Sequence, residues 1–145
     1  MRRSAIVGLL LLCPALHGCF LLDLLDPAET TIRLVNNSDF PVRVLMYVGD
    51  DQNALRDVLT ATGERFELEL AVGQTRTITR RCERLQAVVI DNADLRVIGG
   101  IGPEADTGVL RDGTDFNCRD AIVFTFDHSV LIIDFGIDVT VERRN

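Results

Sequence analysis

The sequence contains no lysine, and all fifteen of its basic residues are arginine. A Walker-type phosphate loop, a Schiff-base enzyme and a Ser/Lys hydrolase each need the primary amine of a lysine side chain. The composition therefore excludes these three classes of catalyst.

Aromatic side chains that stack on flat ligands are also scarce, since the chain has no tryptophan and one tyrosine, Tyr47. Clefts for sugars and for single-stranded nucleic acid use such rings. The formal net charge is −7, and an acidic surface repels phosphate backbones. We therefore expect no nucleic-acid partner and no glycosidase cleft built on paired carboxylates. The nearest approach to a basic patch is the group Arg76, Arg80, Arg81 and Arg84.

Histidine is limited to His17 near the N-terminus and His128 in the body of the chain. A Ser/His or Cys/His catalytic pair would have to use His128. Its neighbour Ser129 would point to the other side of a strand, Ser38 lies in a predicted turn, and no G-x-S-x-G elbow is present. We interpret His128 as a turn residue, and we expect no catalytic residue, no enzyme activity and no cofactor.

The N-terminus has the order of an export signal, with a positive start, an apolar run and a cleavage region. Arg2 and Arg3 come first, residues 5–13 (AIVGLLLLC) are apolar, and Pro14 follows. The run then ends in the tetrapeptide Leu16-His17-Gly18-Cys19.

This arrangement resembles the signal peptide of bacterial lipoproteins. Their lipobox has an aliphatic residue at −3, a small residue at −1 and a cysteine at +1, which Leu16, Gly18 and Cys19 supply. His17 departs from the usual Ala, Ser or Thr at −2. The alternatives are an ordinary cleaved signal and an uncleaved span over residues 4–22. The span is disfavoured because Pro14, His17 and Gly18 lie in its second half and no cationic or aromatic flank follows it.

The resemblance implies a signal peptide over residues 1–18, a lipidated tether over 19–30 and a folded domain over 31–145. The thiol of Cys19 would carry a diacylglyceryl group, so the lipid bilayer would be the first partner of the protein. Phe20 stands at +2, where Asp holds lipoproteins in the inner membrane, and this favours the outer membrane, facing the periplasm or the cell surface. Loss of Arg2 and Arg3 would change the formal charge from −7 to −9.

Two cysteines, Cys82 and Cys118, remain once Cys13 leaves with the signal and Cys19 carries lipid. In an exported protein such a pair predicts a disulfide. The alternative of a structural zinc site needs four ligands, and the mature chain has one histidine. We therefore predict a disulfide and no metal.

The body has room for one domain, and its apolar residues repeat mostly with period two, which is typical of half-buried strands. Strands are expected over residues 31–35 and 42–48, which would form a hairpin, and then around 66–70, 75–80, 85–90, 95–98, 121–126, 130–135 and 137–141. One short helix, capped by Asp50 or Asp51 and ending near Gly63, would bury Leu55, Val58 and Leu59. Seven to nine short strands favour an all-β antiparallel sandwich of immunoglobulin-like type over a barrel.

The segment 99–120 is the longest irregular stretch and the place where a binding loop is expected. This segment and the residues just before it contain many carboxylates, which either form solvated acidic turns or bind Ca²⁺. We expect a non-enzymatic structural or binding module of the cell envelope with an envelope protein as partner; the alternative is a calcium- or ligand-dependent module using this loop. The carboxylates are Asp91, Asp94, Glu104, Asp106, Asp112, Asp115 and Asp120.

Overall fold

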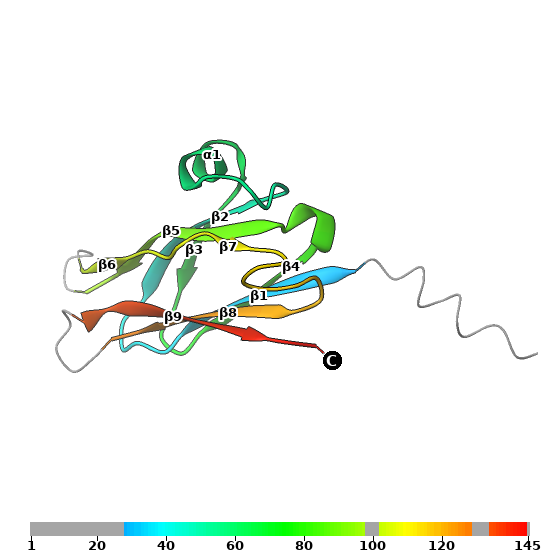
Figure 1. Cartoon of the computed structure of the whole chain (residues 1–145). Helices are drawn as coiled ribbons and strands as arrows, with labels where there is room; N and C mark the ends of the chain where they lie inside the picture. Colours follow the sequence, from blue (N-terminus) through cyan, green and yellow to red (C-terminus); the bar gives the residue numbers. More distant parts are fainter. Residues whose placement is uncertain (1–27, 98–101, 129–133, 145) are drawn as a thin grey trace, which may run out of the picture.

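The computed structural model describes residues 28–97, 102–128 and 134–144, which form two β-sheets packed face to face with one helix outside them (Figure 1). Sheet A has the strand order β4-β1-β8-β9 and sheet B the order β3-β2-β5-β6, with β7 also paired to β5. Sheet A consists of β1 (Glu29–Asn36), β4 (Thr75–Arg81), β8 (Ala121–Asp127) and β9 (Gly136–Glu142). Sheet B consists of β2 (Val42–Gly49), β3 (Glu64–Leu70), β5 (Ala87–Leu95), β6 (Glu104–Ala105) and β7 (Leu110–Arg111).

The predicted β-sandwich is confirmed, with two differences in its pairing. The β1–β8 pair is parallel, whereas the other pairs in the described residues are antiparallel. The strand orders also differ from the ABED and CFG orders of immunoglobulin domains. The likeness to that fold is therefore one of architecture and not of connectivity. The first strand also begins at Glu29, two residues before the strand predicted from Thr31.

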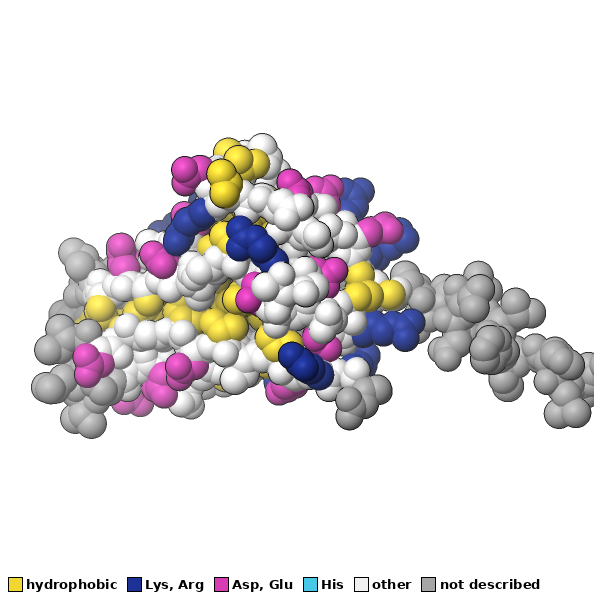
Figure 2. Space-filling view, viewed as in Figure 1, with side chains coloured by type: hydrophobic (Ala, Val, Ile, Leu, Met, Phe, Trp, Pro, Cys, Tyr) yellow, Lys and Arg dark blue, Asp and Glu magenta, His cyan; other side chains and the backbone are white. Residues whose placement is uncertain are grey.

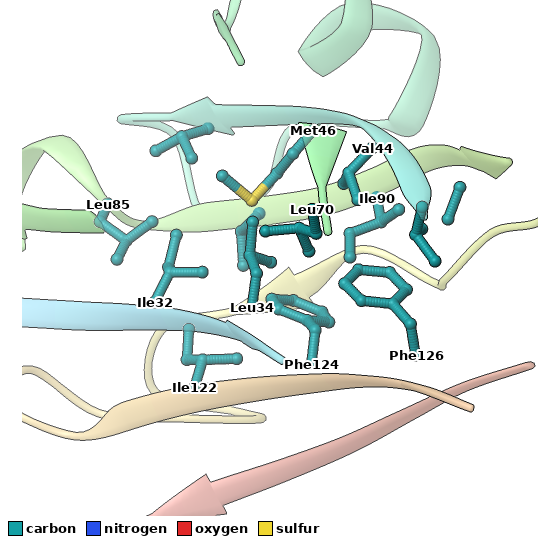
Figure 3. Packing of buried hydrophobic residues seen from close by; sticks show 14 of the residues in the cluster. Ile32, Leu34, Val44, Met46, Leu70, Leu85, Ile90, Ile122, Phe124 and Phe126 are labelled. Atoms are coloured by element: carbon teal, nitrogen blue, oxygen red, sulfur yellow. The ribbon is translucent and has the colours of Figure 1, made fainter. Parts of the chain in front are cut away.

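The core lies between the two sheets and follows from the period-two pattern of the strands. Along β1, Ile32 and Leu34 are fully buried and alternate with partly exposed residues, because successive side chains point to opposite faces. Figure 3 shows Ile122, Phe124 and Phe126 of β8 facing side chains from sheet B such as Met46. A second small cluster of Ala54, Leu59, Ala87 and Val89 lies under the helix, so β5 is buried on both faces at its start.

The predicted hairpin between the first two strands is wrong, although both strands exist. β1 belongs to sheet A and β2 to sheet B, so residues 37–41 carry the chain from one sheet to the other. The chain makes the reverse crossing between β3 and β4, at residues 71–74. Alternation identifies the buried face of a strand but not the strand that pairs with it, and this is why the expectation failed.

Residues 91–94, expected to separate the strands predicted around residues 85–90 and 95–98, are instead part of β5, which continues to Leu95, while Arg96 and Val97 lie outside any strand. Against β2, Leu45 pairs with Asn92 and Met46 pairs with Ile90, so Asp91 is an extra residue in the ladder. This is a β-bulge, which bends the strand without ending it.

The strand expected over residues 130–135 lies mostly outside the described residues. The antiparallel partner of β8 is β9, which begins at Gly136. The strand predicted around residues 137–141 is confirmed.

The one predicted helix is α1 (Arg56–Thr62), and Gly63 is its C-cap residue, so it ends near Gly63 as expected. Neither Asp50 nor Asp51 caps it, because the N-cap residue is Leu55 and Asp51 accepts a hydrogen bond from the Asn53 N–H at 2.8 Å. Only Leu59 of the three expected apolar residues is buried, since Leu55 is 69% and Val58 48% exposed. In the described part of the chain, no helix has the length and apolar character needed to span a bilayer.

Asn36, a fully buried polar residue, ties the two crossings 37–41 and 71–74 together. Its Nδ2 donates to the carbonyl oxygens of Phe40 (2.9 Å), Leu70 (3.1 Å) and Ala71 (3.0 Å). Its Oδ1 accepts the N–H (3.0 Å) and the hydroxyl (2.7 Å) of Ser38. One amide thus bonds backbone groups of both crossings, and its bond to the Leu70 carbonyl is buried.

We predict that Asn36→Ala lowers the free energy of unfolding by about 2–4 kcal/mol, because several buried polar groups lose their partner at once. Urea denaturation measures the loss. Asn37→Ala is the matched control, since Asn37 is exposed and its amide makes one bond of 3.3 Å to Asp127. Equal stabilities of the two variants would show that the amide of Asn36 does not hold the crossings.

Candidate functional site

The end of the sandwich where β1 begins is built around a disulfide. Cys82 and Cys118 form this bond with an S–S distance of 2.01 Å and a Cα–Cα distance of 5.3 Å. Cys82 lies in the short 3-10 helix η1 (Cys82–Arg84), between β4 and β5, and Cys118 lies between β7 and β8. Both connections pass from one sheet to the other, so the disulfide ties two crossings at the opposite end of β1 from Asn36.

The start of β1 is bonded directly to this disulfide region. The Cys82 N–H donates to the carbonyl of Ala28 at 2.9 Å. Thr30 is fully buried, and its hydroxyl oxygen lies 3.5 Å from Cys82 Sγ and accepts the Arg119 N–H at 3.2 Å. The position at which the chain enters the sandwich is therefore fixed by both halves of the cross-link.

Asp120 brings the end of β9 to the same place. Its side chain is buried and accepts the N–H of Asn117 (2.8 Å) and of Arg144 (3.3 Å), while its carbonyl accepts the Thr31 N–H (3.2 Å). Figure 1 shows the beginning of β1 and the C-terminal end of β9 at the same end of the sandwich.

The predicted disulfide is confirmed, and it leaves neither thiol free for the zinc alternative. It differs from the immunoglobulin disulfide, because it joins two connections and not two facing strands. The predicted lipidation residue Cys19 and the signal peptide lie outside the described residues.

The acidic segment expected to form a binding loop is packed on sheet B over most of its described length. Thr107 is buried, donates its N–H to the Ile90 carbonyl and accepts the Ile90 N–H, both at 3.0 Å. Phe116 is 1% exposed and joins the core. With β6 and β7, this segment covers the edge of β5, which would otherwise expose unpaired backbone groups.

Most of the carboxylates proposed for calcium bind arginine side chains or backbone N–H groups. Arg56 on α1 donates to Asp91 (3.1 Å) and Asp106 (3.4 Å), and Arg96 lies 3.6 Å from Asp94. Among the described residues, no three His, Cys, Asp or Glu side chains come together in a way that could hold a metal ion. Asp112, Asp115 and Asp120 accept backbone N–H groups, as in the bonds from Arg111 to Asp115 and from Gly113 to Asp112.

His128 lies at the end of β8 and is not paired with a nucleophile. Its side chain is 9% exposed, Nε2 lies 3.6 Å from Asp39, and the ring meets Phe40 edge-on with centroids 5.6 Å apart. Nδ1 is buried without a hydrogen-bond partner. Ser38 donates to Asn36 and Phe40 instead of to the imidazole, so the described residues do not form a Ser/His pair.

An open cavity of about 650 Å³ lies between α1 and the end of sheet B. Its lining includes apolar residues such as Val58 and Leu59 and an ion pair between Arg80 and Glu64, with Nε and Oε2 3.0 Å apart. The hydrogen bond from Arg80 is the main reason that the pKa of the Glu64 carboxyl is below its ordinary value. The same bond raises the pKa of Arg80.

Sequence reasoning missed three residues that organise the domain: Thr30, Asn36 and Arg56. Asn36 stands in an Asn-Asn-Ser-Asp run and was interpreted only as a turn former. Thr30 and Arg56 bind groups more than 30 positions away. No local pattern could identify those partners.

No protein-family model matches this chain, and neither does any curated protein. Among solved structures, the T6SS lipoprotein TssJ1 from Pseudomonas aeruginosa is 14% identical to this chain, with a TM-score of 0.46. The match covers 83% of this chain and 100% of the TssJ1 chain. Intermedilysin in complex with human CD59 (9% identity, TM-score 0.49) and pneumolysin (7%, 0.47) match 79% and 80% of this chain. The chain corresponds to 24% of each of these two longer chains. These identities and scores are low, so the fold class rests on the strand pairing described above.

We predict that reduction of the disulfide lowers the free energy of unfolding by roughly 4 kcal/mol, because it closes a loop with a sequence separation of 36 residues. Guanidinium denaturation with and without dithiothreitol measures the difference. The double variant Cys82→Ala/Cys118→Ala is the control, since its stability should be low and independent of the reductant. If dithiothreitol lowers the stability of this variant as well, the loss in the native protein does not come from the cross-link.

The Glu64–Arg80 pair predicts a component of the pH dependence of stability. Because the pKa of Glu64 is lowered in the folded state, the carboxylate stabilises the folded protein at a pH above the ordinary carboxyl pKa. This stabilisation is lost as the pH falls through the pKa that Glu64 has in the folded state. Between about pH 5 and 3, the native protein should lose up to about 1 kcal/mol more than Glu64→Gln, because the pair is half exposed. Glu69→Gln on the same strand is the control and should follow the native profile. Parallel profiles for the native protein and Glu64→Gln would contradict the assignment.

Proposed function

We propose that the protein is a lipid-anchored component of a bacterial cell envelope whose β-sandwich is a non-enzymatic structural or binding module. The observation that carries the proposal is the sequence Leu16-His17-Gly18-Cys19, which lies just before a folded domain that begins at Ala28. Cleavage before Cys19 would leave a tether of eight residues, 20–27, between the lipid and that domain. Two or three acyl chains give durable membrane attachment, whereas one binds only marginally.

The disulfide also supports this location. Disulfides persist in exported proteins and are rare in reducing compartments. The Cys82–Cys118 bond links two connections that hold the sandwich together, so the fold is suited to an oxidising envelope. Phe20 at the position after Cys19 favours the outer membrane, with the domain in the periplasm or at the cell surface.

The hydrogen bonds of the buried polar side chains support the structural or binding role. The buried polar groups Thr30, Asn36, Thr107 and Asp120 all hold backbone segments in place. Asp91 and Asp106 bind Arg56 of α1. These residues build a rigid domain on an anchor, and an envelope protein is the partner we propose for it.

We expect the mature protein to begin at Cys19 with acyl groups attached, and to partition into the detergent phase. Intact mass spectrometry and Triton X-114 partitioning of membranes test this. In Cys19→Ala the lipid-modified species should disappear and the protein should leave the detergent phase. Cys13→Ala is the matched control, because Cys13 lies in the predicted signal peptide and its loss should leave the mature mass unchanged.

Two results would contradict the proposal. A mature chain that begins at another residue would exclude lipidation at Cys19. Detergent partitioning that is unchanged in Cys19→Ala would indicate that residues 4–22 remain as an uncleaved membrane span.

A further inference from the structure

The outermost strands of the two sheets, β3 and β4, follow each other in the chain and are joined by the crossing 71–74. Within the described residues, β3 is paired only with β2 and β4 only with β1. Each strand therefore has one row of backbone N–H and C=O groups without a strand partner in that part of the chain. We call the side of the sandwich formed by these two rows the β3–β4 side.

Arg80 shows how the two outermost strands lie relative to each other. Its Nε donates to Oε2 of Glu64 at 3.0 Å, and its Cζ lies 4.9 Å from the centre of the Phe66 ring. The crossing joins the end of β3 to the start of β4, while Arg80 near the end of β4 meets Glu64 at the start of β3. The two strands are therefore antiparallel, one in each sheet, and Thr77 stands at the level of Glu67.

The β3–β4 side lacks the features that usually prevent a strand edge from pairing. Residues 64–81 contain no proline, and neither ladder has a bulge. The charge of Arg80 is neutralised by Glu64. By contrast, the segment of β6 and β7 covers the edge of β5. The β3–β4 side is thus open to a further strand.

An apolar strip lies between the two open edges. Phe66 and Leu68 of β3 and Ile78 of β4 pack against the core but are only partly buried. Val72, in the crossing between the strands, is 55% exposed. Apolar area of this kind is typical of the centre of an interface, with charged groups around it.

The two edges carry opposite charges. Their charged residues are Glu64, Arg65, Glu67 and Glu69 on β3, and Arg76, Arg80 and Arg81 on β4. Within the described ranges, Glu69 and Arg76 are the two members of this set without an ion pair. The edges are therefore complementary in total charge and also in the charge that remains after internal pairing.

We propose that the β3–β4 side binds a second copy of this chain, with β4 of each copy antiparallel to β3 of the other. A two-fold axis parallel to the strands produces this arrangement, because it exchanges the two layers and keeps the direction of every strand. Sheet A of each copy then continues into sheet B of the other, and the two contacts are identical.

The contacts across this axis are favourable. Arg80 would meet Glu64 of the second copy in addition to its own, which gives a ring of four alternating charges. Ile78 would lie beside Phe66 of the second copy, so the apolar strips of both copies become buried. Such cross-strand pairs are the main source of stability between neighbouring strands.

Pairing of like strands does not have this complementarity. Two antiparallel β4 strands centred on Ile78 would place Arg76 opposite Arg80, and like charges directly opposite each other destabilise a strand pair. The outermost strand on the other side of sheet A is β9, and a row of hydrophobic side chains lies between it and the segment of β6 and β7 (Figure 2). The charged residues of β9 are Asp138 and Glu142, so two β9 edges bring acids together.

Acidic residues beside the paired strands oppose the dimer only weakly. Asp50, Asp51 and Arg84 line the cavity next to Glu64 and Arg80, which leaves an excess of one negative charge per copy at that end. These three residues are exposed, so salt screens the repulsion between the copies.

The proposed axis also keeps both chain entries at one end of the dimer, since it preserves strand direction. Both copies can thus be attached to one membrane, a point that rests on the proposed lipid anchor, whereas the strand pairing does not. Edges of seven residues are about 23 Å long, and a face about 20 Å deep would bury roughly 900 Å² over both copies. Stable complexes bury about 1,200–2,000 Å², so we expect a weak dimer that forms at high local concentration.

Cysteine cross-linking in the purified full-length protein tests the arrangement. Thr77→Cys and Glu67→Cys are made separately, and each variant and their equal mixture are oxidised with copper phenanthroline. Thr77 would lie opposite Glu67 of the second copy, whereas the two copies of either residue would lie on opposite outer faces. The mixture should therefore give at least about fivefold more cross-linked dimer than either variant alone.

Thr140→Cys is the matched control for the cross-linking. Thr140 is an exposed threonine on β9, the outermost strand at the other side of sheet A. It should give no cross-linked dimer alone or in a mixture with Glu67→Cys.

A charge placed at the interface gives a second measurement. Thr79→Arg would stand opposite Arg65 of the second copy, and it should raise the dimer dissociation constant about fivefold because two such pairs form per dimer. Thr140→Arg adds the same charge on β9 and should leave the constant unchanged. Sedimentation velocity over a concentration series measures the constant, and circular dichroism with the disulfide-bonded mass establishes that each variant is folded.

Three results would overturn the inference. Either cysteine variant that cross-links alone as well as in the mixture would show pairing of like strands. Cross-linking through Thr140→Cys would place the contact at β9. A protein that stays monomeric throughout the series, with no cross-link in the mixture, would have no such interface. None of these results depends on acylation of Cys19, so failure of the anchor and failure of the dimer are distinguishable.

Discussion

The structure depends on keeping two apolar sheet faces in contact while the chain passes between the sheets four times. The crossings β1–β2 and β3–β4 are tied at one end by the buried amide of Asn36, and those at β4–β5 and β7–β8 are tied at the other by the Cys82–Cys118 disulfide. Strand ladders hold each sheet internally, but the sheets need these links to keep their relative positions. Apolar packing supplies most of the stabilisation, and the two links specify how the sheets align.

The disulfide end has a second consequence, because it fixes where the chain enters the domain. Thr30, Cys82, Arg119 and Asp120 form one bonded unit, and the end of β9 joins it through Arg144. A tether attached at this point transmits its position to the whole sandwich.

The strands were predictable from sequence, whereas their partners were not. Alternation in β1 and β2 correctly gave two half-buried strands, yet the polar run after Asn36 suggested a hairpin where the chain changes sheets. Asp91 was a plausible turn residue, but β5 continues through it as a bulge. Arg56 on α1 satisfies its carboxylate there. In both cases a short polar segment was compatible with two structures, and contacts distant in sequence selected one of them.

By itself, the sequence determined the class of fold and the identity of the disulfide, because period-two burial is a local property and the lipobox-like motif assigns Cys13 and Cys19 to the signal and the anchor, which leaves Cys82 and Cys118 to pair. It also carries the lipobox-like motif on which the proposed anchor rests. The tertiary structure alone decided the parallel pairing of β1 with β8, the distribution of the acidic residues among arginine and backbone partners, and the bonds of Asn36 to both crossings. The physical reason is that each of these depends on which distant segments meet, and a strand pattern identifies its buried face without identifying its neighbour.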